Sequence, residues 1–517
     1  MASTKEQQKD SYKALMDYMK SPEHRTGNII REDSELGAKQ IKRLVETQAL
    51  TPIIDGWYYV TSSVKQPDPK EWYLNYWQFI VAYLDDKYGE DWCLSSDMSL
   101  LFLGKNGILP KQLVIRSSGA SNTRLSLPLG YELLEVEAEC PDEVVREPRF
   151  GLRIYPLHLA LLAASPGFYR MYPMEARTCL ANLRDYDELA RLAVESDRRT
   201  GACKVAGGIH SIGYPSFADE IILALRRAGY EAEKDNPFPE NIMVHGDQPA
   251  IKARIYLMWM KMRPYVLTWK DFCDTCPKDR KVGEIMAMMN DVRIRDGVNS
   301  LNLHGLHVTE QLIEESDTPN CDYLLADLEL ETDDVLAAQG YNRAFRQVKS
   351  DILDSMSGGQ EPSKLIDRLE AWHSCMVSPF VETGWGTWYR AEGFRKGECP
   401  IAQSVHVPVE PGALEDAMSE LRYLLSLEPD AFVRAVLGHF FIVYIHPFMD
   451  DNAILARLYM NSQLVTGGYP WTVIPEGEKG EYDDVLEKTC ENQDTLLFTT
   501  LITKAIDRSA WKAGKQG

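Results

Sequence analysis

The sequence has few cysteines and no apolar segment of the length that a membrane span needs. Ten cysteines are scattered irregularly over 517 residues, which favours reduced thiols over a disulfide framework. The first ten residues, MASTKEQQKD, lack the apolar core of a secretory signal, and no apolar run reaches about 18 residues. These absences predict a cytoplasmic protein, bacterial in style, with no membrane partner.

A basic excess is also missing from the chain. Lys and Arg total 56 against 77 Asp and Glu, for a net charge of −21, so the whole chain does not coat nucleic acid and any DNA contact must be local. The apolar share of 44% and the charged share of 26% exclude a disordered or fibrous protein. At about 150 residues per domain, this length predicts about three domains.

The first 62 residues carry nine basic and nine acidic residues and are the least acidic part of the chain. We predict a helix over Lys9–Lys20 that Ser21-Pro22 ends. A second helix is predicted over Glu35–Gln48, with Asp33 or Ser34 as its N-cap. The following TPIIDGWYYV contains two β-rich runs joined through an Asp-Gly pair, which predicts a β-hairpin.

This order of helix, turn, helix and hairpin is the layout of a winged helix-turn-helix, which we assign to residues 1–63. Lys39, Lys42 and Arg43 form a basic stripe on the second helix. A recognition helix would touch the phosphates of double-stranded DNA with such a stripe. A winged helix that contacts only protein is the alternative.

Residues 64–245 have the pattern of an α/β domain. Strands are predicted in KQLVIRSS, YELLEVEA and GLRIYPLH, and helices in WYLNYWQFIVAYLDDKYG, EARTCLANL and YDELARLAVESDRR. Two short helices follow in GACKVAGGIHSIGYPSFADEIILALRRAGYE, with Gly207-Gly208 expected in a turn. No acids, bases and nucleophiles cluster there at catalytic spacing, so we predict a structural or recognition role.

The rest of the chain has a helical pattern. We assign residues 246–310 to a helical linker and 311–517 to an all-α domain, broken by a turn at Gly384 and Gly386 and a flexible segment near 390–412. Cys273 and Cys276 form a lone CxxC. Because no further ligands follow at zinc-finger spacing, ordinary thiols are favoured over a metal or redox site.

One stretch, residues 439–475, carries the pattern of a catalytic site. An apolar helix leads into His446, an acidic loop follows, and a new helix begins near Ala453. A loop that opens onto a helix N-terminus offers unpaired N–H groups to a phosphate, and Asp450 could hold Mg²⁺ there. His446 could act as a general base, and Arg457 could reach a phosphate. The alternative is a buried helix–loop–helix with a capping Asp.

The stretch HPFMDDNAILAR resembles the Fic (Fido) signature HPFx[D/E]GNGRxxR. The resemblance extends to LEAWHSCMVSP, to SVHVPVEPGALEDAM, and to the segments RAVLGHFFIVYIHPF, ARLYMNSQLVTGGYPWTVIP and EYDDVLEKTCENQD. It implies an all-α Fic fold at the C-terminus of a multidomain chain. It also implies transfer of AMP, or another nucleotide-derived phosphoryl group, from ATP or another nucleotide with Mg²⁺ to a protein hydroxyl.

The resemblance assigns roles to individual residues. His446 matches the catalytic base, Phe448 the core anchor and Asp450 the Mg²⁺ ligand, while Asn452 matches the Asn of the anion-binding loop and Arg457 the last motif arginine. It also matches His406, Val407 and Pro408 to the flap that clamps the target segment.

Three positions of the nucleotide loop depart from the signature: Asp451 and Ala453 stand for glycines, and Ile454 stands for an arginine. Ala453 reduces the room for a phosphate, and Ile454 removes a hydrogen-bond donor worth about 1.5–3 kcal/mol. Asp451 could repel a polyphosphate by up to about 4 kcal/mol. The base and the metal ligand are kept while the phosphate cradle is not, which predicts a weakened enzyme or an altered donor.

A second family element, an inhibitory helix with [S/T]xxxE[G/N], resembles residues 300–305. Ser300 and Gly305 match it, but His304 stands where the family has a Glu that pairs with the last motif arginine. The resemblance therefore implies that this clamp is lost. The alternative is a plain helix end with a glycine C-cap.

The N-terminal half resembles, more loosely, the abortive-infection antitoxin type (AbiEi-like), through KVAGGIHSIGYPSFADEIILALRRAGYE. In that group the winged helix binds operator DNA. The leading hypothesis is a Fic-type protein adenylyltransferase, weakened in its phosphate loop, with a DNA-binding N-terminus. The competing hypothesis is a non-catalytic DNA-binding regulator or toxin–antitoxin module that keeps the Fic fold for ligand or protein binding. The target protein and the operator are open, and a homodimer is an open alternative for the assembly.

Overall fold

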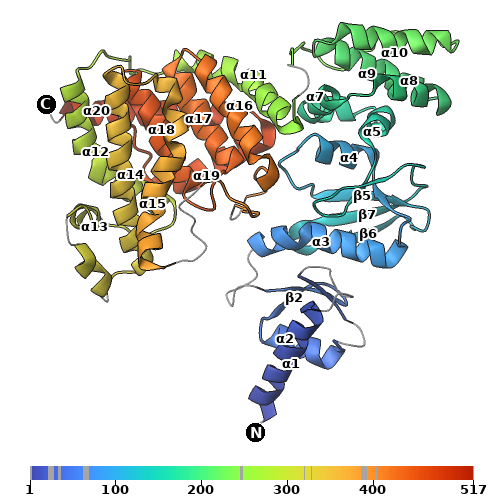
Figure 1. Ribbon diagram of the computed structural model, residues 1–517, viewed down its shortest axis with the longest axis horizontal. Coiled ribbons are helices and arrows are strands. Elements are labelled where there is room, and N and C mark those ends of the chain that lie inside the picture. Colours follow the sequence, from blue (N-terminus) through green and yellow to red (C-terminus); the bar gives the residue numbers. More distant parts are fainter. Residues whose placement is uncertain are drawn as a thin grey trace. The chain divides into compact units, whose positions relative to one another are not determined.

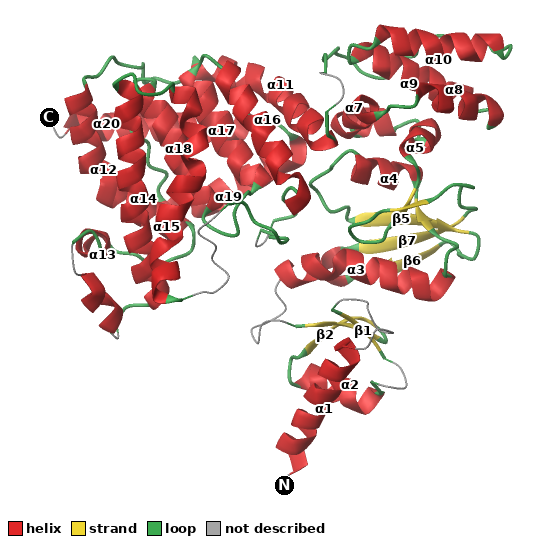
Figure 2. Ribbon diagram, in the orientation of Figure 1, coloured by secondary structure: helices red, strands yellow, loops and turns green. Residues whose placement is uncertain are grey.

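The computed structural model describes residues 3–20, 28–32, 36–61, 69–244, 248–318, 321–327, 329–385, 393–401 and 404–515 (Figures 1 and 2). The chain divides into two compact units. Unit 1 is Met1–Ala250 together with Pro400–Val407, and unit 2 is Ile251–Cys399 together with Pro408–Gly517. The chain therefore passes between the units three times.

The N-terminal elements of unit 1 are two helices and three short strands: α1 Ser3–Lys20, β1 Ile29–Arg31, α2 Ala38–Glu46, β2 Leu50–Ile54 and β3 Trp57–Val60. The strands form an antiparallel sheet in the order β1-β3-β2. The predicted hairpin turns at Gly56, whose φ of 77° only glycine adopts cheaply.

The structure differs from the expectation for this region in two places. The strand β1 was not predicted, because three residues are too few to show an alternating pattern. The helix α2 begins at Ala38 with Gly37 as its N-cap. The predicted caps, Asp33 and Ser34, lie outside the described residues, as does Ser21-Pro22. The winged-helix assignment itself stays a prediction.

The next part of unit 1 is a four-stranded sheet with helix α3, Pro69–Tyr88, against it (Figure 2). The strands are β4 Cys93–Leu94, β5 Gln112–Ser117, β6 Thr123–Ser126 and β7 Glu132–Glu137, in the order β4-β5-β7-β6. Along β5 every second residue is buried, as a strand with one covered face requires. The buried strand residues share one core with the aromatic face of α3, formed by Trp72, Tyr76 and Phe79. A separate ribbon pairs β8 Val145–Arg146 with β9 Arg153–Ile154.

Among its described residues, unit 1 has seven further α-helices: α4 Ser96–Leu103, α5 Leu157–Ala163, α6 Phe168–Met171, α7 Pro173–Asn182, α8 Tyr186–Glu195, α9 Arg199–Ser211 and α10 Pro215–Arg227. The turn predicted at Gly207-Gly208 is wrong, since both glycines lie inside α9 and are buried. A Cβ on Gly207 would lie 2.2 Å from the backbone of Asp235. Close packing, rather than a turn, is the reason for this glycine.

Unit 2 is helical, as predicted: α11 Ala250–Lys270, α12 Val282–Leu303, α13 Glu310–Glu315, α14 Thr332–Met356, α15 Leu369–Thr383, α16 Leu414–Leu427, α17 Ala431–Ile445, α18 Asn452–Thr466, α19 Lys479–Asn492 and α20 Leu496–Lys515. Helix α17 is mostly apolar, is buried along nearly its whole length, and packs on α16 and α18 inside the bundle (Figure 1), as expected for a core helix. Gly438 permits this approach, because a Cβ there would lie 2.2 Å from the Tyr459 ring.

The predicted turn after α15 is present at Gly384, which has a φ of 69°, while Gly386 lies outside the described residues. No helix in the described ranges combines the length and the apolar character needed to cross a membrane.

Candidate functional site

The candidate site is the short loop between α17 and α18, at residues 446–451. His446 ends α17 with a φ of 54°, and Asp451 precedes α18 with a φ of 63°. Two left-handed residues therefore turn the chain sharply at both ends of the loop. The first N–H groups of α18 have no acceptor within their own helix, so the loop brings His446 and Asp450 next to a positive helix end.

Arg395 fixes the backbone at His446, and sequence reasoning missed it. Its guanidinium donates to the carbonyl of His446 at 2.7 Å, to that of Gly397 at 2.8 Å and to that of Val409. Its backbone N–H donates to the carbonyl of Pro447 at 2.9 Å. Arg395 is only 3% exposed. No motif or periodicity marks this residue, because its partners are backbone carbonyl groups, and the one at His446 lies 51 positions away in the sequence.

Two further motif residues hold the loop in shape. The Phe448 ring stacks on His373, with centroids 4.0 Å apart and planes at 12°, and burial lowers the pKa of His373 to about 4, so this partner stays neutral. The side-chain amide of Asn452 accepts from the N–H of Phe448 and donates to its carbonyl, both at 2.9 Å. The side-chain amide of Asn452 is thus used to hold the shape of the loop.

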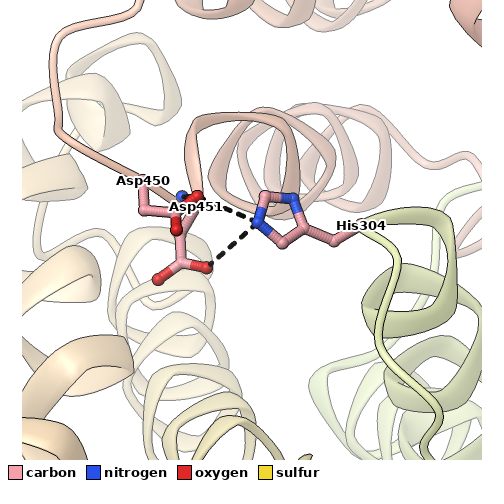
Figure 3. Close-up of side chains that lie close together, drawn as sticks. All are labelled: His304, Asp450 and Asp451. Atoms are coloured by element: carbon pink, nitrogen blue, oxygen red, sulfur yellow. Dashed lines mark hydrogen bonds and ion pairs between the residues drawn. The ribbon is translucent and has the colours of Figure 1, made fainter. Parts of the chain in front are cut away.

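The acidic side of the loop contacts α12. The Nε2 atom of His304 lies 2.9 Å from Oδ1 of Asp450 and 4.0 Å from Oδ1 of Asp451 (Figure 3). Burial lowers the pKa of His304, but its hydrogen bond with Asp450 and the charges of both aspartates outweigh this and raise it overall. Burial and the charge of Asp450 raise the pKa of Asp451 to about 7.

The motif arginine and the expected inhibitory segment also meet. Arg457 donates to the Oγ of Ser300 at 3.2 Å and to its carbonyl at 2.8 Å, and a third bond reaches the hydroxyl of Tyr482 at 3.4 Å. Arg457 is 3% exposed. The guanidinium of Arg457 is therefore bonded to residues of α12 and α19.

Helix α12 ends at Leu303, and Gly305 follows with a φ of 101°. This geometry is that of a glycine-capped helix end, and the same segment places Ser300 on Arg457 and His304 on Asp450. The two interpretations of residues 300–305 are therefore compatible. Of the three departing loop residues, Asp451 and Ile454 are buried and Ala453 is half-buried at the start of α18.

The remaining predicted site residues belong to other elements of the chain. His406 is buried within unit 1, where it bridges to Ile108 and where its Nδ1 lies 3.2 Å from the carbonyl of Gly107. Val407 belongs to unit 1 and Pro408 to unit 2. On α2, Lys39 and Lys42 are exposed and Arg43 is half-buried. The thiols of Cys273 and Cys276 belong to no metal-binding cluster among the described residues.

A buried histidine beside Arg457 should make the free energy of unfolding of unit 2 depend on pH. The Nε2 of His439 lies 2.7 Å from the hydroxyl of Tyr482, and burial, with the charge of Arg457, lowers the pKa of His439 well below its usual range. As the pH falls, His439 binds a proton in the unfolded chain before it does so in the folded chain. The stabilisation is therefore fully present above about pH 6.5, and below that pH the free energy of unfolding falls by up to about 1.4 kcal/mol per pH unit. His439→Gln should flatten the pH dependence of the urea unfolding midpoint between pH 6.5 and 5.

His307→Gln is the matched control, because His307 is exposed and should leave that slope unchanged. Equal slopes for His439→Gln and the native chain would contradict a neutral, buried His439.

The Fic/DOC family model matches residues 365–464, which include this loop. The protein adenylyltransferase Fic of Drosophila virilis is 33% identical over 114 residues, which are 20% of this chain and 23% of that protein. Its counterpart from Nematostella vectensis is 34% identical over 122 residues, 23% of this chain and 28% of that protein. The chain thus matches under a third of the length of these relatives.

Among solved structures, Fic-1 of C. elegans aligns over 70% of this chain and 99% of its own length, at 15% identity and a TM-score of 0.37. A similarity this low is not evidence of a shared whole-chain architecture. The residues that the family model matches include helices α15, α16 and α17 and most of α18. Residues 365–464 are therefore a Fic domain within a multidomain chain.

Proposed function

We propose that this protein transfers AMP, or another nucleotide-derived phosphoryl group, from a nucleotide to a protein hydroxyl, at a rate weakened by its phosphate-binding loop. The observation that carries the proposal is the pairing of a fixed base with an acidic loop: Arg395 holds the backbone at His446, and Asp450 lies in the same turn. The adenylyltransferase relatives, which match a fraction of their length, support the same reaction class.

The proposed step is a displacement at the α-phosphorus. The target hydroxyl oxygen forms the new P–O bond, the bond to the β-phosphate breaks, and pyrophosphate leaves when ATP is the donor. His446 accepts the hydroxyl proton. Mg²⁺ would neutralise charge on the phosphates, with Asp450 as its protein ligand. The N–H groups at the start of α18 would face the same phosphates.

The low rate that we propose follows from the side chains in and around the phosphate-binding loop. Ile454 is fully buried and offers no donor, and Arg457 is bonded to Ser300 and Tyr482. The carboxyl group of Asp451 stands where the signature has only a glycine hydrogen. A polyphosphate therefore meets fewer donors and one more acid than the signature provides, which lowers transition-state stabilisation.

Label transfer tests the proposal. The full chain, a cell extract and Mg²⁺ should yield a labelled protein band with one of ATP, GTP, UTP or CTP carrying a labelled α-phosphate. His446→Ala should abolish the label, while His307→Ala, at an exposed position outside the loop, should keep it. No label with any nucleotide, or label that survives His446→Ala, would favour the non-catalytic regulator.

The alternative function is a DNA-binding regulator in which the Fic domain binds a ligand or a protein. The exposed side chains of Lys39 and Lys42 on α2 favour it. Replacing Lys39, Lys42 and Arg43 together by alanine should weaken duplex binding and reduce its salt dependence by roughly one ion per lost contact. Fluorescence anisotropy over a series of salt concentrations measures both quantities.

The control for this prediction is the double variant Lys479→Ala, Lys488→Ala, which removes two exposed lysines of α19 and should leave the salt slope unchanged. Undiminished duplex binding by the α2 variant would assign that helix a protein-contact role instead.

A further inference from the structure

We infer that His304, Asp450 and Asp451 together hold a divalent transition-metal ion of the zinc type, without any nucleotide. One ligand atom from each residue lies within 4.8 Å of the other two. A zinc-type ion lies about 2.0–2.2 Å from nitrogen and oxygen ligands, which places such ligands about 3–4 Å from one another. The two distances from Nε2 of His304, 2.9 Å and 4.0 Å, fall close to this range.

The carboxylate of Asp451 gives independent support. Asp451 is only 8% exposed, its side chain makes no capping hydrogen bond to α18, and its contact with Nε2 of His304 is long, at 4.0 Å. It faces the imidazole of His304 and the carboxylate of Asp450 (Figure 3). Two adjacent carboxylates repel each other, and a buried acid without a close hydrogen-bond partner is costly. A divalent cation between them removes both penalties.

The donor set indicates which cation fits. Imidazole suits zinc and its neighbours in the first transition row, whereas Mg²⁺ prefers oxygen ligands alone. Neither His304 nor Asp451 belongs to the Fic signature, whose metal ligand is matched by Asp450 alone. Two of the three inferred ligands thus stand at positions where this chain departs from the family, and the inference does not depend on the proposed transfer reaction.

Such an ion would connect two separate elements of unit 2. His304 follows the last turn of α12, and both aspartates precede α18, nearly 150 positions later. A metal bond across this distance stabilises only the folded state, so binding should raise thermal stability. It would also fix the end of α12 over the loop that carries His446.

Zinc binding to the metal-stripped full chain tests the inference. Equilibrium dialysis, with zinc quantified by mass spectrometry, should show one ion per chain that His304→Ala and Asp451→Asn each weaken by about tenfold or more, since even indirect partners of a metal cost that much. The same ion should raise the melting temperature of the native chain but not of His304→Ala. Millimolar Mg²⁺ should not displace it.

His307→Ala is the matched control, an exposed histidine three residues away on the same segment, and should bind zinc as the native chain does. Far-UV circular dichroism confirms that each variant is folded, and His304→Gln serves if His304→Ala is not. Equal zinc affinity in His304→Ala and the native chain overturns the inference, as does displacement by Mg²⁺. If His307→Ala loses zinc affinity to the same extent as His304→Ala, the ion binds at another site.

Discussion

The triple variant Asp451→Gly, Ala453→Gly, Ile454→Arg should transfer AMP at least about 10²-fold faster than the native chain, which is about 2.7 kcal/mol in the barrier. Asp451 has a φ of 63°, a conformation that glycine adopts at little cost, and its removal takes a carboxylate away from the phosphates. The glycine at position 453 returns room for close approach, and the arginine supplies a donor fork. Initial rates of label transfer from ATP to protein measure the gain.

Two further variants test whether the gain has the proposed cause. Ile454 is fully buried, so an arginine there either turns toward the phosphates or buries its charge; the double variant Asp451→Gly, Ala453→Gly avoids that cost and should show part of the gain. Adding His446→Ala to the triple variant should abolish it, because the hydroxyl proton then has no acceptor in the loop. If the native chain transfers label from another nucleotide faster than the triple variant does, Asp451 and Ile454 determine the choice of nucleotide.

Arg395→Ala should lower the free energy of unfolding of unit 2 by about 3 kcal/mol or more. The guanidinium donates to three carbonyls while almost fully buried, and hydrogen bonds to a charged donor contribute about 1.5–3 kcal/mol each, without strict additivity. The loss also frees the backbone at His446, so label transfer should fall with stability. Urea unfolding and transfer rates, measured on the same samples, test both effects.

Arg346→Ala is the control for Arg395→Ala. Arg346 pairs with Asp317 at 2.6 Å but is 56% exposed, and exposed ion pairs contribute only about 0–1 kcal/mol. If the two variants unfold at similar urea concentrations, the hydrogen bonds that Arg395 donates to the backbone contribute little to the free energy of unfolding. Arg395→Lys should recover little, because an ammonium group cannot reach three carbonyls in a plane.

Local signals in the sequence predicted local structure well. The Asp-Gly turn places the hairpin β2–β3, with Gly56 in the left-handed region, and the apolar run before His446 predicts the buried helix α17. The signature HPFMDDNAILAR predicted a Fic domain, and the family match over residues 365–464 confirms it.

The missed features depend on contacts between distant parts of the chain. Gly207 looks like a turn residue until the backbone of Asp235 is packed against it. Arg395 lies in a segment with no periodic pattern, and its partners are carbonyl groups, which every residue has. The pairing of His304 with Asp450 joins residues 146 positions apart. Spacing alone carries no information on such contacts.

The membership of Pro400–Val407 in unit 1 has a consequence for synthesis on the ribosome. The rest of unit 1 is complete at Ala250, yet the partner of Gly107 and Ile108 is His406, which is translated some 150 residues later. At about 5–20 residues per second, roughly 8–30 s pass between the synthesis of Ala250 and that of His406, and during this time the backbone at Gly107 and Ile108 lacks its partner segment. Unit 1 therefore cannot be finished as a continuous N-terminal fragment, and a chain interrupted before residue 407 leaves this backbone open to other polypeptides.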